Sequence, residues 1–239
     1  MPGHAALDLR GLRAIPPATW GRRDLRRLVA AEMGLEALPD GVGALTALQT
    51  LDVAHNRLTD LPAAVGTLAG LEILYVGDNR LAALPDAVRG LRRLAYLGAD
   101  ANAITWLPGW IGELCALVEL RLQGNALRAL PGALGGLAGL RELHLRDNAL
   151  EELPAALGRL GELRHLDLRA NRLRALPTEL GDLRRLRVLD LRANPLEGLP
   201  EALAGLPALE KLDLRWTPMY PELPAVARAL RDRGCVVLA

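Results

Sequence analysis

The sequence of 239 residues contains no phenylalanine and few aromatic residues, cysteines or lysines. Aromatic residues make up only 3% of the chain, so a hydrophobic core must be built from aliphatic side chains. The formal net charge is +1 at pH 7, which argues against a general nucleic-acid binder, because such proteins carry a strong basic excess. No apolar run reaches the ~18 residues of a membrane helix, and the first residues lack the pattern of a secretory signal.

Only two cysteines are present, Cys115 and Cys235. In the repeat described below they lie five units apart, or ~24 Å at ~4.8 Å per strand, whereas a disulfide needs Cα atoms within ~7 Å. We therefore expect two unpaired thiols, both buried as small apolar residues, in a reducing cytoplasmic compartment. Lys211 is the only lysine among 29 basic residues, and this bias toward arginine, with abundant alanine, glycine and proline, points to a GC-rich bacterial genome.

Leucine is in excess, and it recurs at a fixed spacing of 23 residues. One unit, from Leu140 to Glu162, reads LRELHLRDNALEELPAALGRLGE. The same step separates seven asparagines: Asn56, Asn79, Asn102, Asn125, Asn148, Asn171 and Asn194. It also separates nine prolines: Pro16, Pro39, Pro62, Pro85, Pro108, Pro131, Pro154, Pro177 and Pro200. Such a period predicts a solenoid in which each unit packs only against its neighbours.

Each position of the unit has a physical interpretation. In L-x-L the leucines alternate with polar residues, which predicts a short strand buried on one face, and stacked units then form a parallel sheet. The asparagine side chain has donors and an acceptor with which to satisfy backbone groups inside the coil. The proline fixes φ and suits an irregular return segment. A glycine follows Val65, Ile111, Leu157 and Leu180, where it either relieves crowding or permits an unusual φ.

These motifs resemble the leucine-rich repeat family over about residues 5–239. The similarity is greatest to the 23-residue class with the segment L-P-x-x-[IVL]-G-x-L, as in Ras-suppressor-like proteins and many bacterial repeat proteins. The resemblance implies an α/β solenoid, a horseshoe with a parallel concave sheet and an irregular or short helical convex side. It also implies a scaffold for signalling assemblies, with a small GTPase or another signalling protein as the partner.

We predict one leucine-rich repeat domain over residues 1–239. It comprises atypical capping units over 1–47, seven regular units over 48–208 and a C-terminal cap over 209–239. Trp20 is expected to cover the first layer of the core. At the other end we expect an amphipathic helix over 225–233 and a closing strand over 235–238.

The residues that alternate with the strand leucines should face solvent on the concave side, with neighbours in a column ~4.8 Å apart. In the C-terminal half the tripeptide D-L-R repeats. It places a column of aspartates beside a column of arginines: Asp167, Asp190 and Asp213, and Arg146, Arg169, Arg192 and Arg215. This pattern fits either a ladder of mutually neutralised ion pairs or a polar strip that docks a partner, for which arginine is well suited.

Aromatic residues gather in the N-terminal half of the same face. Ile73, Tyr75 and Tyr96 should cluster on neighbouring strands, flanked by Gly77 and Gly98. Tyrosine is enriched at binding hot spots, so this cluster is a candidate contact. Trp216, at the edge of a C-terminal strand, is a second candidate or a capping residue. We expect Trp106 and Trp110 to pack in the outer layer.

Glu142, His144, His165 and Asp167 should form a polar square across two adjacent strands. Imidazoles and carboxylates can ligate a divalent metal or support acid–base chemistry. The sequence shows no lid over this open face, and no P-loop, H-E-x-x-H, G-x-S-x-G or C-x-x-C motif. We therefore predict no metal, no cofactor and no catalytic residue.

The sequence thus predicts a non-enzymatic scaffold that binds another protein on its concave face, without a membrane partner. The predicted contact residues are Ile73, Tyr75, Tyr96, Arg121, His144, Arg146, Asp167, Arg169, Asp190, Arg192, Asp213, Arg215 and Trp216. Three alternatives remain open: an anion or nucleic-acid binder that uses the arginine column, a metal-dependent enzyme at the polar square, and a structural unit of an assembly.

Overall fold

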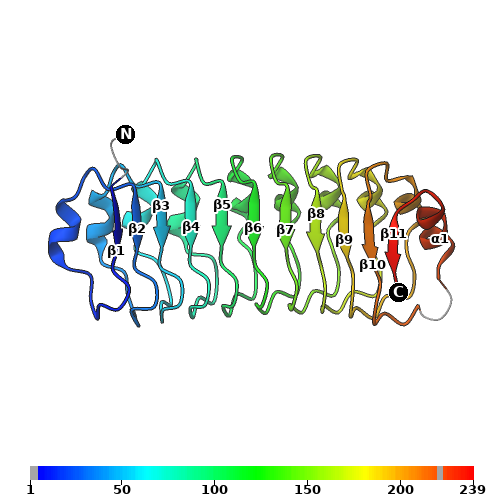
Figure 1. The fold of residues 1–239 in the computed structure, drawn as a ribbon, viewed down its shortest axis with the longest axis horizontal. Coiled ribbons are helices and arrows are strands. Elements are labelled where there is room, and N and C mark those ends of the chain that lie inside the picture. Colours follow the sequence, from blue (N-terminus) through cyan, green and yellow to red (C-terminus); the bar gives the residue numbers. More distant parts are fainter. Residues whose placement is uncertain (1–4, 220–222) are drawn as a thin grey trace.

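A computed structural model describes residues 5–219 and 223–239. Within them the chain forms one sheet of eleven parallel strands that lie side by side in sequence order (Figure 1). The strands are β1 (Ala6–Asp8), β2 (Arg27–Val29), β3 (Thr50–Asp52), β4 (Ile73–Tyr75), β5 (Tyr96–Gly98), β6 (Glu119–Arg121), β7 (Glu142–His144), β8 (His165–Asp167), β9 (Val188–Asp190), β10 (Lys211–Asp213) and β11 (Val236–Leu238). The predicted solenoid with a parallel sheet is confirmed.

Short 3-10 helices lie behind the strands in Figure 1 and form the other side of the solenoid. Each follows a proline of the 23-residue period, whose fixed φ sets the direction of the chain. Their bounds are Pro17–Gly21, Asp40–Ala44, Ala63–Thr67, Asp86–Gly90, Gly109–Glu113, Gly132–Gly136, Ala155–Arg159, Thr178–Asp182 and Glu201–Gly205. The predicted short helical side of the solenoid is therefore confirmed.

The C-terminal end closes as the sequence predicts. Helix α1 (Ala225–Asp232) buries Val226, Ala227 and Leu230, and β11 then pairs with β10. At the N-terminal end Trp20 packs against the core, where Gly41 leaves room for its ring. A Cβ on Gly41 would lie 2.6 Å from that ring, so glycine is required at this contact. The domain boundaries at residues 47 and 208 stay predictions.

The leucine columns form one continuous core between the sheet and the 3-10 helices. The central leucine of every strand from β2 to β10 is fully buried: Leu28, Leu51, Leu74, Leu97, Leu120, Leu143, Leu166, Leu189 and Leu212. Burial of a leucine side chain stabilises a fold by ~1.5–3 kcal/mol relative to exposure. Stacked layers of this kind hold the strands in one register and so fix the positions of the side chains on the opposite face.

The asparagine ladder joins consecutive units from inside. The Oδ1 atom of Asn171 accepts the Leu150 backbone N–H at 3.0 Å, and its Nδ2 donates to the backbone carbonyls of Leu145 and Leu168 at 3.0 and 2.9 Å. The other six asparagines make the equivalent bonds. The prediction that these side chains satisfy buried backbone groups is confirmed.

The residue before each of the seven asparagines adopts a left-handed conformation, as does the residue before Met33 and Thr217, which take the place of asparagine in end units. The non-glycine examples are Glu32, His55, Asp78, Ala101, Asp147, Ala170, Ala193 and Trp216, with φ between 49° and 60°. In one unit the position is occupied by Gly124. Left-handed backbone disfavours most side chains, yet the residue types here vary widely, so the sequence pattern did not indicate this turn.

Close approach explains the glycines of the 3-10 helices. A Cβ on Gly112 would lie 2.2 Å from the Ala133 carbonyl oxygen, and one on Gly158 would lie 2.4 Å from the Glu179 carbonyl oxygen. Neither glycine has a left-handed φ. Of the two interpretations of these glycines, relief of crowding is therefore correct.

Two predictions about buried residues are wrong in part. Cys115 and Cys235 are unpaired as expected, but only Cys235 is buried, because Cys115 lies in the exposed turn before β6. Trp106 is 55% exposed and does not pack in the outer layer. Trp110 does pack against the core, and its Nε1–H donates to Asp86 Oδ1 at 3.0 Å.

Candidate protein-interaction surface

The side of the sheet that faces away from the 3-10 helices is called the open face below; it is the face predicted to be concave. Strand register places its side chains in the columns that the period predicts. Tyr75 of β4 is the partner of Asp52 on β3 and of Gly98 on β5. His144 of β7 stands beside Asp167 of β8. Because all strands share one register, residues 23 apart in the sequence are neighbours in space.

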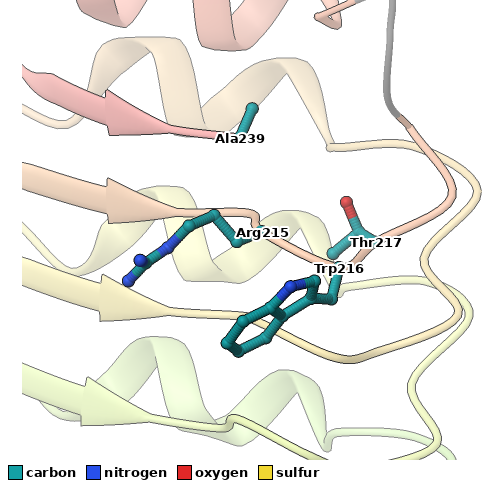
Figure 2. Close-up of a pocket in the computed structure, with 4 residues that line it drawn as sticks. All are labelled: Arg215, Trp216, Thr217 and Ala239. Atoms are coloured by element: carbon teal, nitrogen blue, oxygen red, sulfur yellow. The ribbon is translucent and has the colours of Figure 1, made fainter.

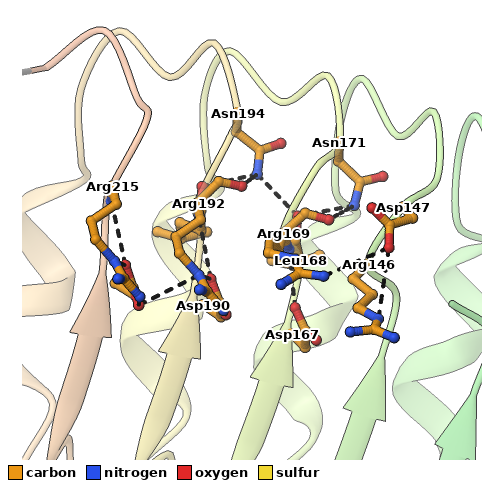
Figure 3. A network of polar contacts seen from close by, with 12 residues as sticks. Arg146, Asp147, Asp167, Leu168, Arg169, Asn171, Asp190, Arg192, Asn194 and Arg215 are labelled. Carbon is orange, nitrogen blue, oxygen red and sulfur yellow. Dashed lines mark hydrogen bonds and ion pairs between the residues drawn. The ribbon is translucent and has the colours of Figure 1, made fainter. Parts of the chain in front are cut away.

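In the C-terminal part of the open face, arginine and aspartate side chains form two clusters (Figure 3): Asp190, Arg192, Asp213 and Arg215 in one, and Arg146, Asp147 and Arg169 in the other. The Arg192 Nε donates to both Asp190 carboxylate oxygens at 2.9 and 3.0 Å. Arg215 makes a similar forked contact with Asp213, at 2.9 and 2.7 Å. Arg192 also lies 3.4 Å from Asp213 on the next strand, so the pairs are linked across strands.

The aspartates occupy this column because they also bind the backbone. Oδ1 of Asp167, Asp190 and Asp213 accepts the N–H of the residue two positions later, at 3.1, 3.2 and 3.4 Å. Burial favours the protonated form of Asp213, but the bonds from Arg215 and the charge of Arg192 outweigh it and lower the pKa of Asp213. The pKa of Arg215 is raised by the same bond. Both groups are therefore charged at neutral pH.

Ion pairing reduces what the arginine column offers to a partner. Arg146 and Arg169 both approach Asp147, at 3.7 and 3.8 Å. Only 1% of the Asp213 side chain is exposed, so a partner meets the arginines above it and not this carboxylate. The geometry supports the interpretation of a largely self-neutralised ladder.

The predicted polar square is rearranged at the level of side-chain atoms. His144 Nε2 lies 3.2 Å from Glu142 Oε2 and 3.9 Å from Glu119 Oε1. The His165 ring packs beside the His144 ring, with centroids 5.0 Å apart. Burial and the neighbouring His144 lower the pKa of His165. Asp167 bonds the Arg169 backbone instead of joining this group.

Glu119, Glu142 and His144 bring one ligand atom each within 4.8 Å of one another, which is the reach of a metal ion. However, Arg121 Nε lies 2.5 Å from Glu119 Oε1, so a cation of the chain already occupies this carboxylate. Like charge near a bound metal opposes its binding. The arrangement therefore favours an internal ion pair over a metal site.

The two tyrosines form a compact aromatic pair. The ring centroids of Tyr75 and Tyr96 are 4.8 Å apart, and the rings are tilted by 48°. The pair lies over Gly98, where a Cβ would be 3.1 Å from the Tyr96 ring. The Arg121 guanidinium sits 5.9 Å above the centroid of Tyr96. Tyr96 is half-buried, and this burial raises its pKa to about 12.

Trp216 is the most exposed large apolar side chain of the described residues, at 73%. It follows β10, has a φ of 60°, and holds the Arg215 guanidinium 5.7 Å from its ring centroid. Figure 2 shows Trp216 beside a hollow that is also lined by Thr217 and Ala239. This exposure does not fit a capping role, so Trp216 remains a candidate contact.

Sequence reasoning missed three carboxylates on the open face. Glu119 approaches His144 and pairs with Arg121. Asp52 is the register partner of Tyr75, and Asp100 Oδ1 lies 2.9 Å from where a Cβ of Gly77 would be. The column positions of all three were readable from the period, and charges compared across strands would have drawn attention to them.

Comparisons with known proteins agree with this architecture. The sequence model of the leucine rich repeat family matches residues 46–104, 115–173 and 161–219. A comparison with curated proteins gave no significant match. Among the described residues, none of the helices has the length and apolar character needed to span a bilayer.

Three solved structures illustrate the similarity. A leucine-rich repeat protein of Leptospira interrogans is 28% identical with a TM-score of 0.77, over 98% of this chain and 65% of that chain. The ectodomain of the Arabidopsis thaliana receptor kinase GASSHO1/SCHENGEN3, in complex with CASPARIAN STRIP INTEGRITY FACTOR 2, is 33% identical with a TM-score of 0.78, over 89% and 27%. The leucine-rich effector YopM of Yersinia pestis is 29% identical with a TM-score of 0.68, over 82% and 50%.

The chain thus spans less than two thirds of the length of each of these three proteins. The match to the family model nevertheless covers more than half of this chain, and the strands, core and asparagine ladder agree with it. The chain belongs to the leucine-rich repeat family.

Proposed function

We propose that this protein is a non-enzymatic scaffold that binds another protein or peptide on its open face. The observation that carries this proposal is the placement of Tyr75 and Tyr96 on a sheet face with no helix over it among the described residues, together with the exposed Trp216 just beyond β10. Aromatic side chains anchor many protein contacts. A face held by a packed core also needs little ordering on binding, which lowers the entropic cost.

A relative of the same fold supports this choice. The Arabidopsis thaliana receptor ectodomain was solved in complex with CASPARIAN STRIP INTEGRITY FACTOR 2. The partner that we propose for the present chain is a different protein or peptide. A signalling protein such as a small GTPase is one candidate. The unpaired thiols of Cys115 and Cys235 fit a reducing, cytoplasmic setting.

Binding to nucleic acid or another polyanion is the weaker candidate. Such binding needs free cationic groups, because affinity comes largely from neutralised phosphates. Arg192 and Arg215 are committed to Asp190 and Asp213 by forked hydrogen bonds. Their charge is therefore balanced before any ligand arrives.

The test is a panning experiment with a displayed library of random peptides. Selected peptides are measured on the wild type, on the double variant Tyr75→Ala/Tyr96→Ala, and on the control Trp106→Ala, which changes an exposed aromatic residue off the open face. We expect the double variant to lose at least tenfold in affinity, while circular dichroism shows that it remains folded. Equal binding by the wild type and the double variant would overturn the proposal.

A further inference from the structure

The open face repeats one arrangement of three groups: an aromatic ring, an arginine and a carboxylate. In the first case Arg121 lies over the ring of Tyr96 at 5.9 Å and pairs with Glu119. In the second case Arg215 lies 5.7 Å from the ring of Trp216 and pairs with Asp213. An arginine so placed gains both ring and charge contacts.

Tyr75 has the ring and the carboxylates of this arrangement, but in the described residues no arginine is stacked on its ring. Asp52 stands beside it on β3, and the Asp100 carboxylate leans over Gly77, two residues beyond Tyr75. Within residues 5–219 and 223–239, neither carboxylate forms an ion pair, and the Tyr75 ring has no cation stacked on it. Among the residues that the structure describes, the one hydrogen-bond partner of the Asp52 side chain is the Ala54 backbone N–H, at 3.1 Å.

The surrounding charge has the matching sign. Open-face positions on and just after β2 to β5 carry four carboxylates (Glu32, Asp52, Asp78 and Asp100) and one arginine, Arg27. Asp78 is paired with His55 at 2.8 Å, which raises the pKa of that histidine. Glu32, Asp52 and Asp100 leave an excess of negative charge at these positions, with Arg10 and Arg121 as the nearby cations on either side. In the C-terminal half the aspartates and arginines pair with one another. A complementary partner is therefore cationic here.

We propose that Tyr75, Asp52 and Asp100 form a site for an arginine side chain on a partner peptide or protein segment. This inference rests on the proposed function and specifies the partner. The guanidinium stacks on the Tyr75 ring and donates hydrogen bonds to the flanking carboxylates, as Arg121 does with Tyr96 and Glu119. Arginine is preferred to lysine because its planar group stacks and forms forked bonds.

The test uses a fluorescent peptide of alternating arginine and serine and three matched peptides. Citrulline replaces arginine in the first, which keeps the shape and removes the charge; lysine replaces it in the second and glutamate in the third. Fluorescence anisotropy at 0.15 M salt gives the affinity for the wild type. We expect the arginine peptide to bind at least tenfold more tightly than the citrulline peptide and more tightly than the lysine peptide. Equal binding of arginine and citrulline peptides would overturn the proposal.

Variants then place the site. Asp52→Asn/Asp100→Asn removes the two carboxylate charges. The control Glu151→Gln/Glu152→Gln removes two exposed charges in the segment between β7 and the 3-10 helix Ala155–Arg159. We expect at least a tenfold loss with the first pair and less than a twofold change with the second. Equal losses of affinity in the two double variants would indicate nonspecific electrostatic attraction and would overturn the proposal. If the arginine peptide fails to bind while displayed peptides still depend on Tyr75 and Tyr96, the cationic site is wrong and the proposed function stands.

Discussion

Asp213 of β10 joins two arginines of different repeat units: it accepts hydrogen bonds from Arg215 and lies 3.4 Å from the Nε of Arg192. Its side chain is nearly fully buried, whereas both arginines are partly exposed. The carboxylate therefore acts from beneath the open face. It fixes the direction of two side chains that a partner would meet.

Removing this carboxylate should destabilise the fold. In Asp213→Ala the two arginines lose their buried counter-ion and the Arg215 backbone N–H loses an acceptor, which should cost ~1–3 kcal/mol. The control Asp147→Ala removes a half-exposed carboxylate at longer range from its arginines and should cost less than ~1 kcal/mol. Urea unfolding measures both. Equal losses would show that burial of Asp213 has no special effect.

The asparagine ladder gives a second prediction. Asn171→Leu keeps a branched side chain but leaves the Leu150 N–H without an acceptor. It also removes one of the two asparagine donors of the Leu145 and Leu168 carbonyls, which keep those of Asn148 and Asn194. The unpaired buried N–H and the lost bonds to the two carbonyls should lower the free energy of unfolding by ~1–3 kcal/mol. The neighbouring exposed Arg172→Leu should change it by less than ~0.5 kcal/mol. A stable Asn171→Leu protein would contradict the role given to the ladder.

The close packing of 3-10 helices in neighbouring units can be tested with two glycines of one such helix. Gly112→Ala places a methyl group against the Ala133 carbonyl and should cost ~1–3 kcal/mol through forced separation of the units. Gly109, in the same helix, has no atom within 4 Å of its Cβ position, so Gly109→Ala should be nearly neutral or stabilising. Thermal unfolding separates the two. A larger loss for Gly109→Ala would contradict the packing argument.

His165 should make stability depend on pH. Burial and the adjacent His144 lower its pKa below the ordinary value of 6.5, although Asp167 and Glu142 act in the opposite direction. The folded state therefore binds a proton less readily than the unfolded state. The stability that depends on a neutral His165 is fully present above about pH 6.5 and is lost as the pH falls toward the pKa of the folded state. Between pH 7.5 and 5.5, wild type should lose more stability than His165→Gln. If the free energy of unfolding changed equally with pH in the wild type and in His165→Gln, the lowered pKa of His165 would be contradicted.

Much of the fold follows from the sequence because one spacing determines both the core and the register. The leucines that define the period are buried, and the asparagines bond the coils as expected. The same spacing correctly placed Tyr75 beside Tyr96, since a constant period brings residues 21 or 23 apart onto adjacent strands. Periodicity carries this information without any knowledge of the turns between the strands.

Side-chain direction is what the period could not supply. His144 turns toward Glu142 and Glu119 and not toward Asp167, because Asp167 is held by a backbone N–H of its own unit. Trp106 points into solvent although Trp110, four residues later, packs against the core. These outcomes depend on side-chain rotamers and on competition between hydrogen bonds. The position of a residue in the repeat determines neither.

Site-specific photo-cross-linking is the most direct test of the claim that the open face binds the partner. Benzoylphenylalanine is introduced at Ile73 on β4 or, as the control, at the exposed Trp106 after β5. A peptide selected on the wild type is then added and irradiated, and the adducts are mapped by mass spectrometry. We predict cross-links from position 73 and none from position 106. Cross-links from position 106 with none from position 73 would contradict the account.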